Sequence, residues 1–185
     1  MKKLNILVCS VASVGHVNSC IGATKTLLAR GHKITFLLEE AFRGKAAKFG
    51  FEETIYQNQK RTTKKENGEN GKDHKEDNKQ QKNAGEDLAL ALHNSGLIDP
   101  GTPAEKMTRL QRLTDLVREQ FYGDLDRAVK EAIDRLNPDL IWYDCSLLVP
   151  AVYFSGIPWV INCSMTPIFY EFDPELPPGG SGKKL

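Results

Sequence analysis

The chain has 185 residues, 40% of them hydrophobic, and a formal net charge of +1. This length predicts one domain with its own core, since a domain of about 150 residues already hides about two-thirds of its unfolded surface. The balanced charge argues against nucleic acid or an anionic membrane as the partner.

The first fifty residues alternate between strand and helix patterns. Residues 4–10, LNILVCS, are apolar on both faces, which is typical of a strand covered on both sides in a parallel sheet. A helix follows, and we expect Asn18 or Ser19 to cap its first turn and Gly31 to supply its left-handed end. The next segments predict a second strand and a second helix that ends on glycine, over residues 33–39 and 40–50. This order indicates a βαβ unit.

The N-terminal segment also resembles a secretory signal, because Lys2 and Lys3 precede the apolar run. A buried strand is favoured, since the polar Asn5 interrupts the run and cleavage after it removes a strand that the fold requires. No later stretch approaches the roughly 20 apolar residues of a membrane span. We therefore expect a cytoplasmic protein without a membrane-spanning segment.

The four cysteines show no CxxC spacing, and each lies in or beside an apolar segment: Cys9, Cys20, Cys145 and Cys163. We expect reduced thiols, which favours the cytosol. Asn162-Cys163-Ser164 matches the glycosylation sequon, but its position at the end of a buried strand indicates a chance match.

Residues 58–87 differ in character from the rest of the chain, because they are charged or amide-rich, with Ala84 as the only aliphatic side chain. Such a segment buries too little apolar surface to offset its ordering entropy, so we expect a disordered surface insertion. A nucleic-acid-binding arm is disfavoured, since acids nearly cancel bases and no aromatic residue is interleaved. His74 lies here without the Cys or His neighbours of a metal site.

Apolar residues then recur every three or four positions, which predicts one long amphipathic helix over residues 102–136, with a kink near Gly123. Thr102 and Glu105 form a capping box around a first-turn proline, and Asn137-Pro138 ends the helix.

Two further strands are expected, with a short helix within residues 146–156 between them, over residues 139–144 and 158–164. The chain ends in a loop-like tail, 173–185. The predicted fold class is therefore α/β: a Rossmann-like parallel sheet flanked by helices. Residues 1–57 and 88–172 form its single domain, interrupted by the insertion.

His16 and Asp144 are the candidate catalytic residues. His16 lies just past the first strand, in a turn where histidine is seldom needed for packing, and Asp144 closes the strand over 139–144. Ligands of an open parallel sheet bind outside the carboxyl ends of its strands. A histidine and a carboxylate meeting there suit general-base chemistry, with the carboxylate orienting the imidazole. The alternative is that each residue only caps a strand or turn.

Three other chemistries fit less well. A dinucleotide site has an acid in Glu39 or Glu40, but the first turn offers only Gly15 and then Gly22, so GxGxxG is missing. Asp124-Leu125-Asp126 imitates a metal-binding DxD, but residues two apart on a helix point away from each other, so a solvated helix face is the better explanation. The serines Ser10, Ser13 and Ser164 lack the GxSxG elbow of a hydrolase.

Two segments carry a recognisable order of motifs. The first is NILVCSVASVGHVNSCIGATKTLLARGHKITFLLEE: strand, Gly-His loop, helix, Gly-His and second strand. The second is NPDLIWYDCSLLVPAVYFSGIPWVINCSMTP: Pro-Asp, strand, Asp, helix, Gly-Ile-Pro and a strand ending near a serine. Together they resemble landmarks of the UDP-sugar-dependent glycosyltransferases of the two-domain, metal-independent GT-B type. The family commonly has proline shortly after the first Gly-His, where this chain has Asn18-Ser19-Cys20.

The resemblance implies that His16 is the general base for an acceptor hydroxyl, that Asp144 is its partner, and that the sugar is transferred with inversion and without metal or other cofactor, UDP-sugar being the co-substrate. It implies a small lipophilic alcohol or phenol as acceptor, as in detoxification. Candidate acceptor-lining residues are Val14, Asn18, Met165 and Phe169.

The nucleotide-sugar domain that the family carries after this region has no counterpart here, so the resemblance covers the N-terminal half of a GT-B fold. We expect such a chain to be inactive alone, and UDP-sugar to bind through a missing C-terminal domain or a partner chain. The alternatives are a non-catalytic module that binds a ligand or partner, and one chain of a split glycosyltransferase.

Overall fold

The computed structural model describes residues 2–58, 84–117, 122–145 and 148–164. Five strands form its sheet: β1 (Asn5–Ser10), β2 (Lys33–Glu39), β3 (Glu52–Tyr56), β4 (Leu140–Asp144) and β5 (Trp159–Ile161). The helices are α1 (Val14–Ala29), α3 (Ala84–Asn94), α4 (Pro103–Val117), α5 (Gly123–Leu136) and α6 (Pro150–Tyr153). Short 3-10 turns span Glu40–Phe42 and Ala47–Phe49.

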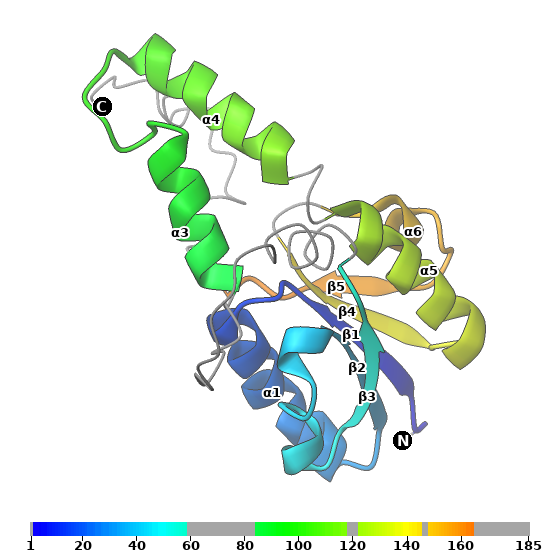
Figure 1. Ribbon diagram of the computed structural model, residues 1–185. Coiled ribbons are helices and arrows are strands. Elements are labelled where there is room, and N and C mark those ends of the chain that lie inside the picture. The colour runs from blue at the N-terminus through cyan, green and yellow to red at the C-terminus, as the bar shows by residue number, and fades with distance from the viewer. Residues whose placement is uncertain (1, 59–83, 118–121, 146–147, 165–185) are drawn as a thin grey trace, which may run out of the picture.

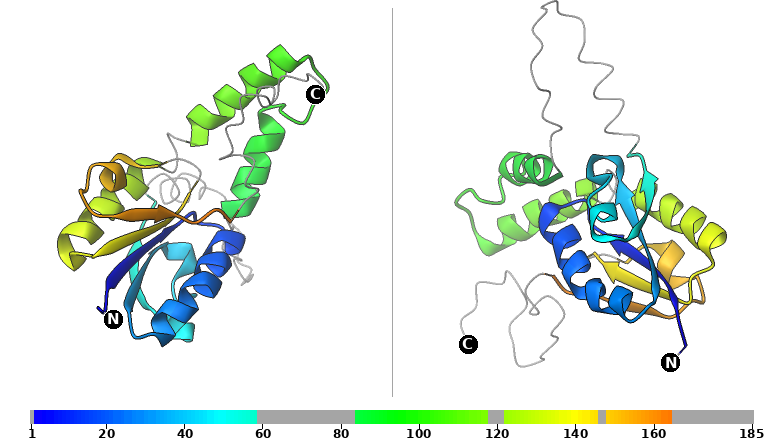
Figure 2. Two further views of the ribbon diagram at one scale, coloured as in Figure 1. Left: turned by 180° about the vertical axis from the view of Figure 1, so that it is seen from behind. Right: turned by 90° about the horizontal axis from the view of Figure 1, so that it is seen from below.

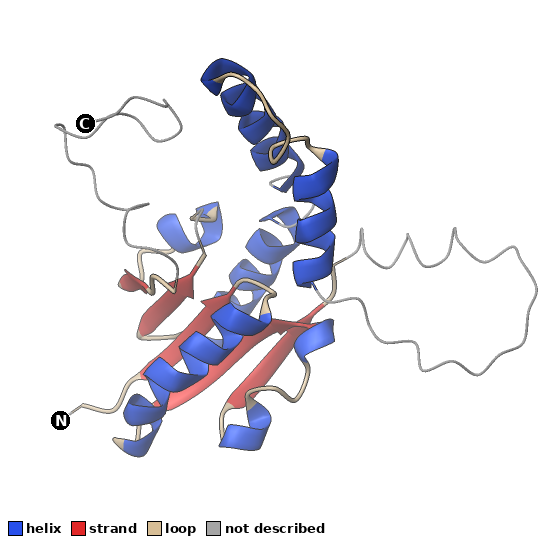
Figure 3. Cartoon of the chain, turned by 90° about the vertical axis from the view of Figure 1, so that its left-hand side faces the viewer, coloured by secondary structure: helices blue, strands red, loops and turns tan. Residues whose placement is uncertain are grey.

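The strands are all parallel, in the order β3-β2-β1-β4-β5. Helix α1 covers one face of the sheet, whereas α5 and α6 cover the other (Figure 1). Figure 2 shows these layers from behind and from below, and Figure 3 shows α1 lying along the strands. The predicted α/β class, with a parallel sheet flanked by helices, is confirmed.

Two apolar cores fill the layers because side chains alternate along each strand. On β1, Ile6 and Val8 face α1, and Leu7 and Cys9 face α5; all four are no more than 1% exposed. Both faces are covered, so the strand is apolar throughout, as the sequence predicted.

The strand boundaries of β1, β2 and β4 match the predicted segments to within one residue. Strand β5 is shorter than expected, covering Trp159–Ile161 of the predicted 158–164. Its last residues are polar, and after one more backbone bond, from Asn162 N to Tyr143 O at 2.7 Å, the chain leaves the ladder.

The helix expected over residues 40–50 is wrong. The chain forms two 3-10 turns separated by Gly44, which has φ +78° and stops a right-handed helix there. The Glu53 carboxylate accepts hydrogen bonds from the backbone N–H groups of Gly44, Ala46 and Ala47 at 2.7–2.9 Å, in place of a helical partner.

Strand β3 was not predicted, because its sequence begins with two glutamates and shows no apolar run. It forms an edge of the sheet, paired only with β2 among the described strands. There its polar residues find partners: Glu52 accepts from Thr35 Oγ1 at 3.2 Å and contacts Lys33 Nζ at 3.1 Å.

The last residues of the segment expected to be a disordered insertion are helical. Helix α3 begins at Ala84, inside the segment 58–87, because its leucine- and alanine-rich sequence favours a helix. Asn58, at the other end of that segment, is buried. The rest of the predicted insertion, together with His74, lies outside the described residues.

The segment expected to be a single helix over 102–136 contains α4, which ends at Val117, and α5, which begins at Gly123. Residues 118–121 between them, next to the expected kink, lie outside the described residues. The capping box is confirmed: Glu105 accepts from Thr102 N at 2.8 Å, and Glu105 N donates to Thr102 Oγ1 at 3.3 Å. Asn137 ends α5 in the left-handed region, with φ 43°.

Helices α3 and α4 extend away from the sheet (Figure 1). Arg109 of α4 donates to the carbonyl oxygen of Gly96 at 3.0 Å, in the connection that follows α3. No helix among the residues described is both long and apolar enough to cross a membrane.

Candidate functional site

The candidate site lies at the carboxyl ends of β1, β4 and β5. The strand order reverses at β1, because β2 and β3 follow on one side of it and β4 and β5 on the other. In open parallel sheets, ligands bind in the crevice outside such a reversal point. The residues that follow β1, end β4 and follow β5 therefore converge where a ligand is expected.

His16 and Asp144 are in contact there, as the sequence predicted. The distance from His16 Nδ1 to Asp144 Oδ1 is 3.2 Å, although 128 positions separate the two residues. The Asp144 side chain is 2% exposed, and that of His16 is 19% exposed. The imidazole thus rests on a buried carboxylate and remains open to solvent on one side.

His16 does not lie in a turn before the helix, contrary to the prediction. Helix α1 begins at Val14 with Ser13 as its N-cap, so His16 is in the first helical turn. Asn18 and Ser19 are therefore inside the helix, and the expectation that one of them caps it is wrong. The Ser13 side chain makes no capping hydrogen bond either.

The Asp144 carboxylate is surrounded by side chains from two parts of the chain, helix α1 and the residues after β5. Its Oδ1 accepts from Ser164 Oγ at 2.9 Å and contacts His16. Its Oδ2 accepts from Cys20 Sγ at 3.3 Å and from Asn162 Nδ2 at 3.1 Å. Both oxygens of this buried carboxylate therefore have hydrogen-bond partners, which fix its orientation.

These donors decide the charge of Asp144. Burial by itself raises the pKa of a carboxyl group, but the hydrogen bonds from His16, Ser164, Cys20 and Asn162 stabilise the ionised form and leave the pKa of Asp144 below its usual value. The carboxylate is therefore negatively charged at neutral pH. Burial, followed by the neighbouring Asp144 charge, raises the pKa of Cys20, so Cys20 stays a neutral thiol.

An ionised carboxylate only accepts hydrogen bonds, so the contact between His16 Nδ1 and Asp144 Oδ1 is a hydrogen bond in the tautomer that has its proton on Nδ1. Nε2 then presents its lone pair, and no hydrogen bond to it is found among the described residues. This tautomer is the one that a general base requires.

Sequence reasoning missed three members of the cluster: Cys20, Asn162 and Ser164. Cys20 was interpreted only as a small hydrophobic residue, Asn162 as part of a chance sequon, and Ser164 as a rejected nucleophile. Asn162 and Ser164 follow β5 just as Asp144 ends β4, so the rule that placed Asp144 at the site also pointed to them. Because the Asn162 amide is engaged by Asp144, its interpretation as a structural residue is favoured over glycosylation.

The acceptor-lining candidates are placed only in part. Val14 and Asn18 lie on the first turns of α1, both exposed, and Val14 is 45% exposed. Met165 and Phe169 lie outside the described residues, as does the predicted tail 173–185.

The two acids of the DxD pattern have structural partners. Asp124 pairs with Arg127 one turn along α5. Asp126 Oδ1 accepts from the backbone N–H of Ala151 at 2.7 Å and so joins α5 to the start of α6. The expected solvated helix face is wrong for Asp124, whose side chain is only 12% exposed. Among the residues described, no group of three or more His, Cys, Asp or Glu side chains is arranged to hold a metal ion.

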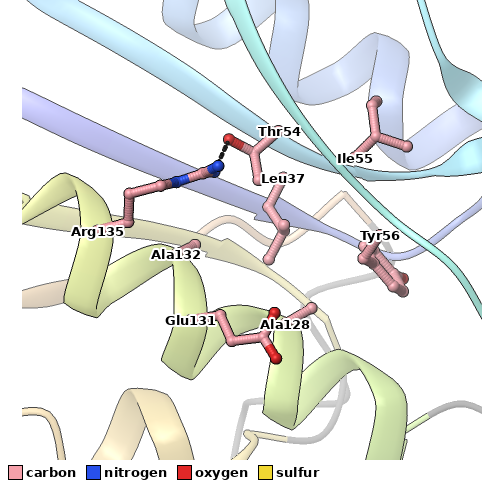
Figure 4. Close-up of a pocket in the computed structure, with 8 residues that line it drawn as sticks. All are labelled: Leu37, Thr54, Ile55, Tyr56, Ala128, Glu131, Ala132 and Arg135. Atoms are coloured by element: carbon pink, nitrogen blue, oxygen red, sulfur yellow. Dashed lines mark hydrogen bonds between the residues drawn. The ribbon is translucent and has the colours of Figure 1, made fainter.

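A pocket of about 220 Å³ lies elsewhere, between β3 and α5 (Figure 4). Leu37, Ala128 and Ala132 belong to its apolar lining, and Arg135 Nη2 donates to Thr54 Oγ1 across it at 2.7 Å. Leu37, Ala128 and Ala132 belong to the core on the α5 side of the sheet. His16 and Asp144 are not among the residues that line it, so this pocket is separate from the candidate site.

Fold and site together define a class: an α/β protein with helices on both faces of a parallel sheet and a His–Asp pair at the reversal point of the strand order. Solved structures to which the chain is similar include glycosyltransferases, the class that the sequence motifs resemble. The calicheamicin glycosyltransferase CalG4 is 22% identical, over 78% of this chain and 27% of its own, with a TM-score of 0.45.

A glycosyltransferase of Streptomyces sp. SF2575, complexed with thymidine diphosphate, is 17% identical over 85% of this chain and 38% of its own, with a TM-score of 0.47. The Glycyrrhiza uralensis protein UGT73P12, complexed with glycyrrhetinic acid 3-O-monoglucuronide, is 13% identical over 86% of this chain and 28% of its own, with a TM-score of 0.43. No protein-family model and no curated protein matches the chain.

The chain therefore spans between 27% and 38% of the length of these three proteins. Each identity is below 25% and each TM-score below 0.5, so these similarities carry no argument about the function of this chain.

Proposed function

We propose that this chain is the acceptor-binding part of an inverting glycosyltransferase that transfers a sugar from UDP-sugar to a hydroxyl group of a small lipophilic acceptor. His16 is its general base, and Asp144 orients that base. The contact between His16 Nδ1 and Asp144 Oδ1 at 3.2 Å carries the proposal. It joins the two residues whose spacing in the sequence resembles the family's landmarks.

The proposed reaction begins with the acceptor hydroxyl next to Nε2 of His16. The acceptor O–H bond breaks, and its proton moves to Nε2. The acceptor oxygen forms a bond to the anomeric carbon of the sugar from the side opposite the diphosphate. The bond from that carbon to the diphosphate oxygen breaks, its electron pair leaves with UDP, and the configuration at the carbon inverts.

Asp144 stabilises the protonated form of His16. When Nε2 takes the proton, the ring becomes an imidazolium ion, and the carboxylate beside Nδ1 stabilises that charge. Two observations support this role: the Asp144 side chain is 2% exposed, and the hydrogen bonds it accepts hold its pKa below the usual value. A carboxylate in such surroundings stays ionised and fixed in place.

The exposed position of Val14, one turn before Asn18 on α1, supports an apolar acceptor lying against the first turns of this helix. Met165 and Phe169 belong to the same proposal through the resemblance. Binding of UDP-sugar is assigned to a further domain or partner chain, and the proposed proton transfer uses no metal ion. The neutral, buried thiols of Cys9, Cys20 and Cys145 support a cytoplasmic setting.

The test is the rate of UDP release from UDP-glucose and a phenolic acceptor, measured with the complete protein that contains this chain. His16→Ala should lower the rate by about 10²–10⁴, the usual effect of a positioned base. His93→Ala is the matched control, because His93 is exposed on α3. A loss of less than about threefold in His16→Ala contradicts the assignment. Acceptor binding without turnover by the wild type supports a binding module instead.

A further inference from the structure

A serine lies between the proposed base and its carboxylate. Ser164 Oγ is 2.8 Å from His16 Nδ1 and 2.9 Å from Asp144 Oδ1, whereas the direct distance from His16 Nδ1 to Asp144 Oδ1 is 3.2 Å. Of the three contacts in this triangle, the two made by the serine are the shorter ones. Ser164 comes from the segment after β5, so it reaches the site from a third strand.

Counting protons decides the directions of these contacts. The ionised carboxylate has no proton to donate, the hydroxyl has one, and Nδ1 has one in the tautomer required of a base. If the Ser164 hydroxyl donated its proton to His16 Nδ1, no proton would lie between Ser164 Oγ and Asp144 Oδ1, which are 2.9 Å apart. The arrangement that satisfies both short contacts runs from Nδ1–H to Ser164 Oγ, and from Ser164 O–H to Asp144 Oδ1.

We propose that Ser164 is a positioning residue that relays the influence of Asp144 to the imidazole of His16. It selects the tautomer with the proton on Nδ1, which leaves Nε2 free as the base. This inference rests on the proposed function for its catalytic meaning, but the hydrogen-bond relay is a property of the folded chain by itself.

The rest of the cluster supports this division of roles. Cys20 and Asn162 both donate to Oδ2 of Asp144, so that oxygen is occupied and the carboxylate cannot rotate freely. Oδ1 is left to face Ser164 and His16. Since Ser164 is exposed, removal of its hydroxyl leaves no cavity in the core.

The first experiment measures the tautomer of His16 in the 185-residue chain by ¹⁵N NMR of the imidazole nitrogens at about pH 8.5, above the ordinary histidine range. Ser164→Ala should lower the ratio of the Nδ1–H to the Nε2–H form by about two- to tenfold, the equivalent of one hydrogen bond. Ser164→Thr keeps the hydroxyl and should restore the ratio. Ser155→Ala is the control, since Ser155 bonds Val152 O away from the site.

An unchanged ratio in Ser164→Ala overturns the relay. Asp144→Asn separates this failure from failure of the proposed function: if that variant alone changes the ratio, the carboxylate acts directly and only the role of Ser164 is lost. If neither variant changes it, the His16–Asp144 base is also contradicted.

The second experiment is kinetic and uses the complete protein with UDP-glucose and a phenol. Ser164→Ala should lower kcat by about two- to tenfold with an unchanged KM, and Ser164→Thr should recover the rate. A raised KM with unchanged kcat indicates a serine that binds substrate and overturns the positioning role.

Discussion

Ser10 and Asp144 are direct partners across the parallel pairing of β1 and β4, and the backbone N–H of Val11 donates to the carbonyl oxygen of Asp144 at 3.1 Å. This pairing places the end of β4 beside the point where β1 turns into α1. His16, in the first turn of that helix, is thereby brought onto the Asp144 carboxylate. A one-residue shift of the β1–β4 register would turn Asp144 to the opposite face of the sheet.

Because Asp144 is buried and ionised, we expect the free energy of unfolding to fall at acidic pH. Since the folded-state pKa is lower than the unfolded one, the ionised carboxylate stabilises the fold above the ordinary aspartate pKa of about 3.9. That contribution is lost as the pH falls through the folded-state pKa. Urea unfolding of the wild type between neutral pH and pH values below about 4 should show this loss.

Asp144→Asn should show a smaller acid-dependent loss over the same window, because its amide does not titrate. At neutral pH it should lower the free energy of unfolding by about 1–3 kcal/mol, since its NH₂ group meets donors where the carboxylate accepted hydrogen bonds. Asp134→Asn makes the same chemical change at an exposed position of α5 and serves as the control. Identical pH dependence in wild type and Asp144→Asn would refute the linkage.

Two valines that differ in burial are expected to contribute differently to the free energy of unfolding. Val129 of α5 is 0% exposed, whereas Val160 of β5 is 40% exposed. Val129→Ala removes two buried methyl groups and should lower the free energy of unfolding by roughly 2–3 kcal/mol. Val160→Ala, the identical chemical change, should cost less than about 1 kcal/mol. Chemical denaturation measures both, and equal effects would argue against the packing of α5 on the sheet.

Gly31 ends α1 with φ +82°, and a Cβ added there would lie 2.6 Å from Lys3 Nζ. The lysine end can move away, but the left-handed backbone remains strained for any L side chain. Gly31→Ala should therefore cost about 1–2 kcal/mol of stability. Gly22→Ala, inside α1 with open space around its Cβ, should instead stabilise by about 0.5–1 kcal/mol. Thermal unfolding distinguishes the two signs, and stabilisation by both changes would contradict the helix end.

The hydrogen bond that Asp126 accepts from Ala151 N predicts a structural role for the DxD pattern, in place of metal binding. Asp126→Ala leaves the backbone N–H of Ala151 without its acceptor and should destabilise by about 1–2 kcal/mol. Asp134→Ala, on the exposed side of the same helix, should have an effect within about 0.5 kcal/mol. Urea denaturation of both variants measures these effects. Calorimetric titration with Mn²⁺ should give the same result for the wild type and for Asp126→Ala, whereas loss of Mn²⁺ binding in the variant would contradict the structural role.

Particular elements explain where sequence-based prediction succeeded. Strands β1, β2 and β4 are apolar on both faces, so their existence and bounds followed from residue type alone. The edge strand β3 is polar, and its glutamates are satisfied by Thr35, Lys33 and three backbone N–H groups, none of which a local pattern can show. The same limit applies to residues 40–50, where Gly44 and the acceptor Glu53 replace a helix with two turns.

The sequence by itself predicted the α/β class and the parallel sheet, because alternating hydrophobic segments and strand ends obey local rules of burial and chain direction. It also placed His16 and Asp144 at the same edge of that sheet, with the capping of a strand or turn as the alternative role of each. Only the tertiary structure decided that His16 lies on a helical turn, and that Cys20, Asn162 and Ser164 complete the surroundings of Asp144. These contacts span 18 to 148 positions of the chain. Their distances depend on strand order and register, which arise when the whole sheet assembles.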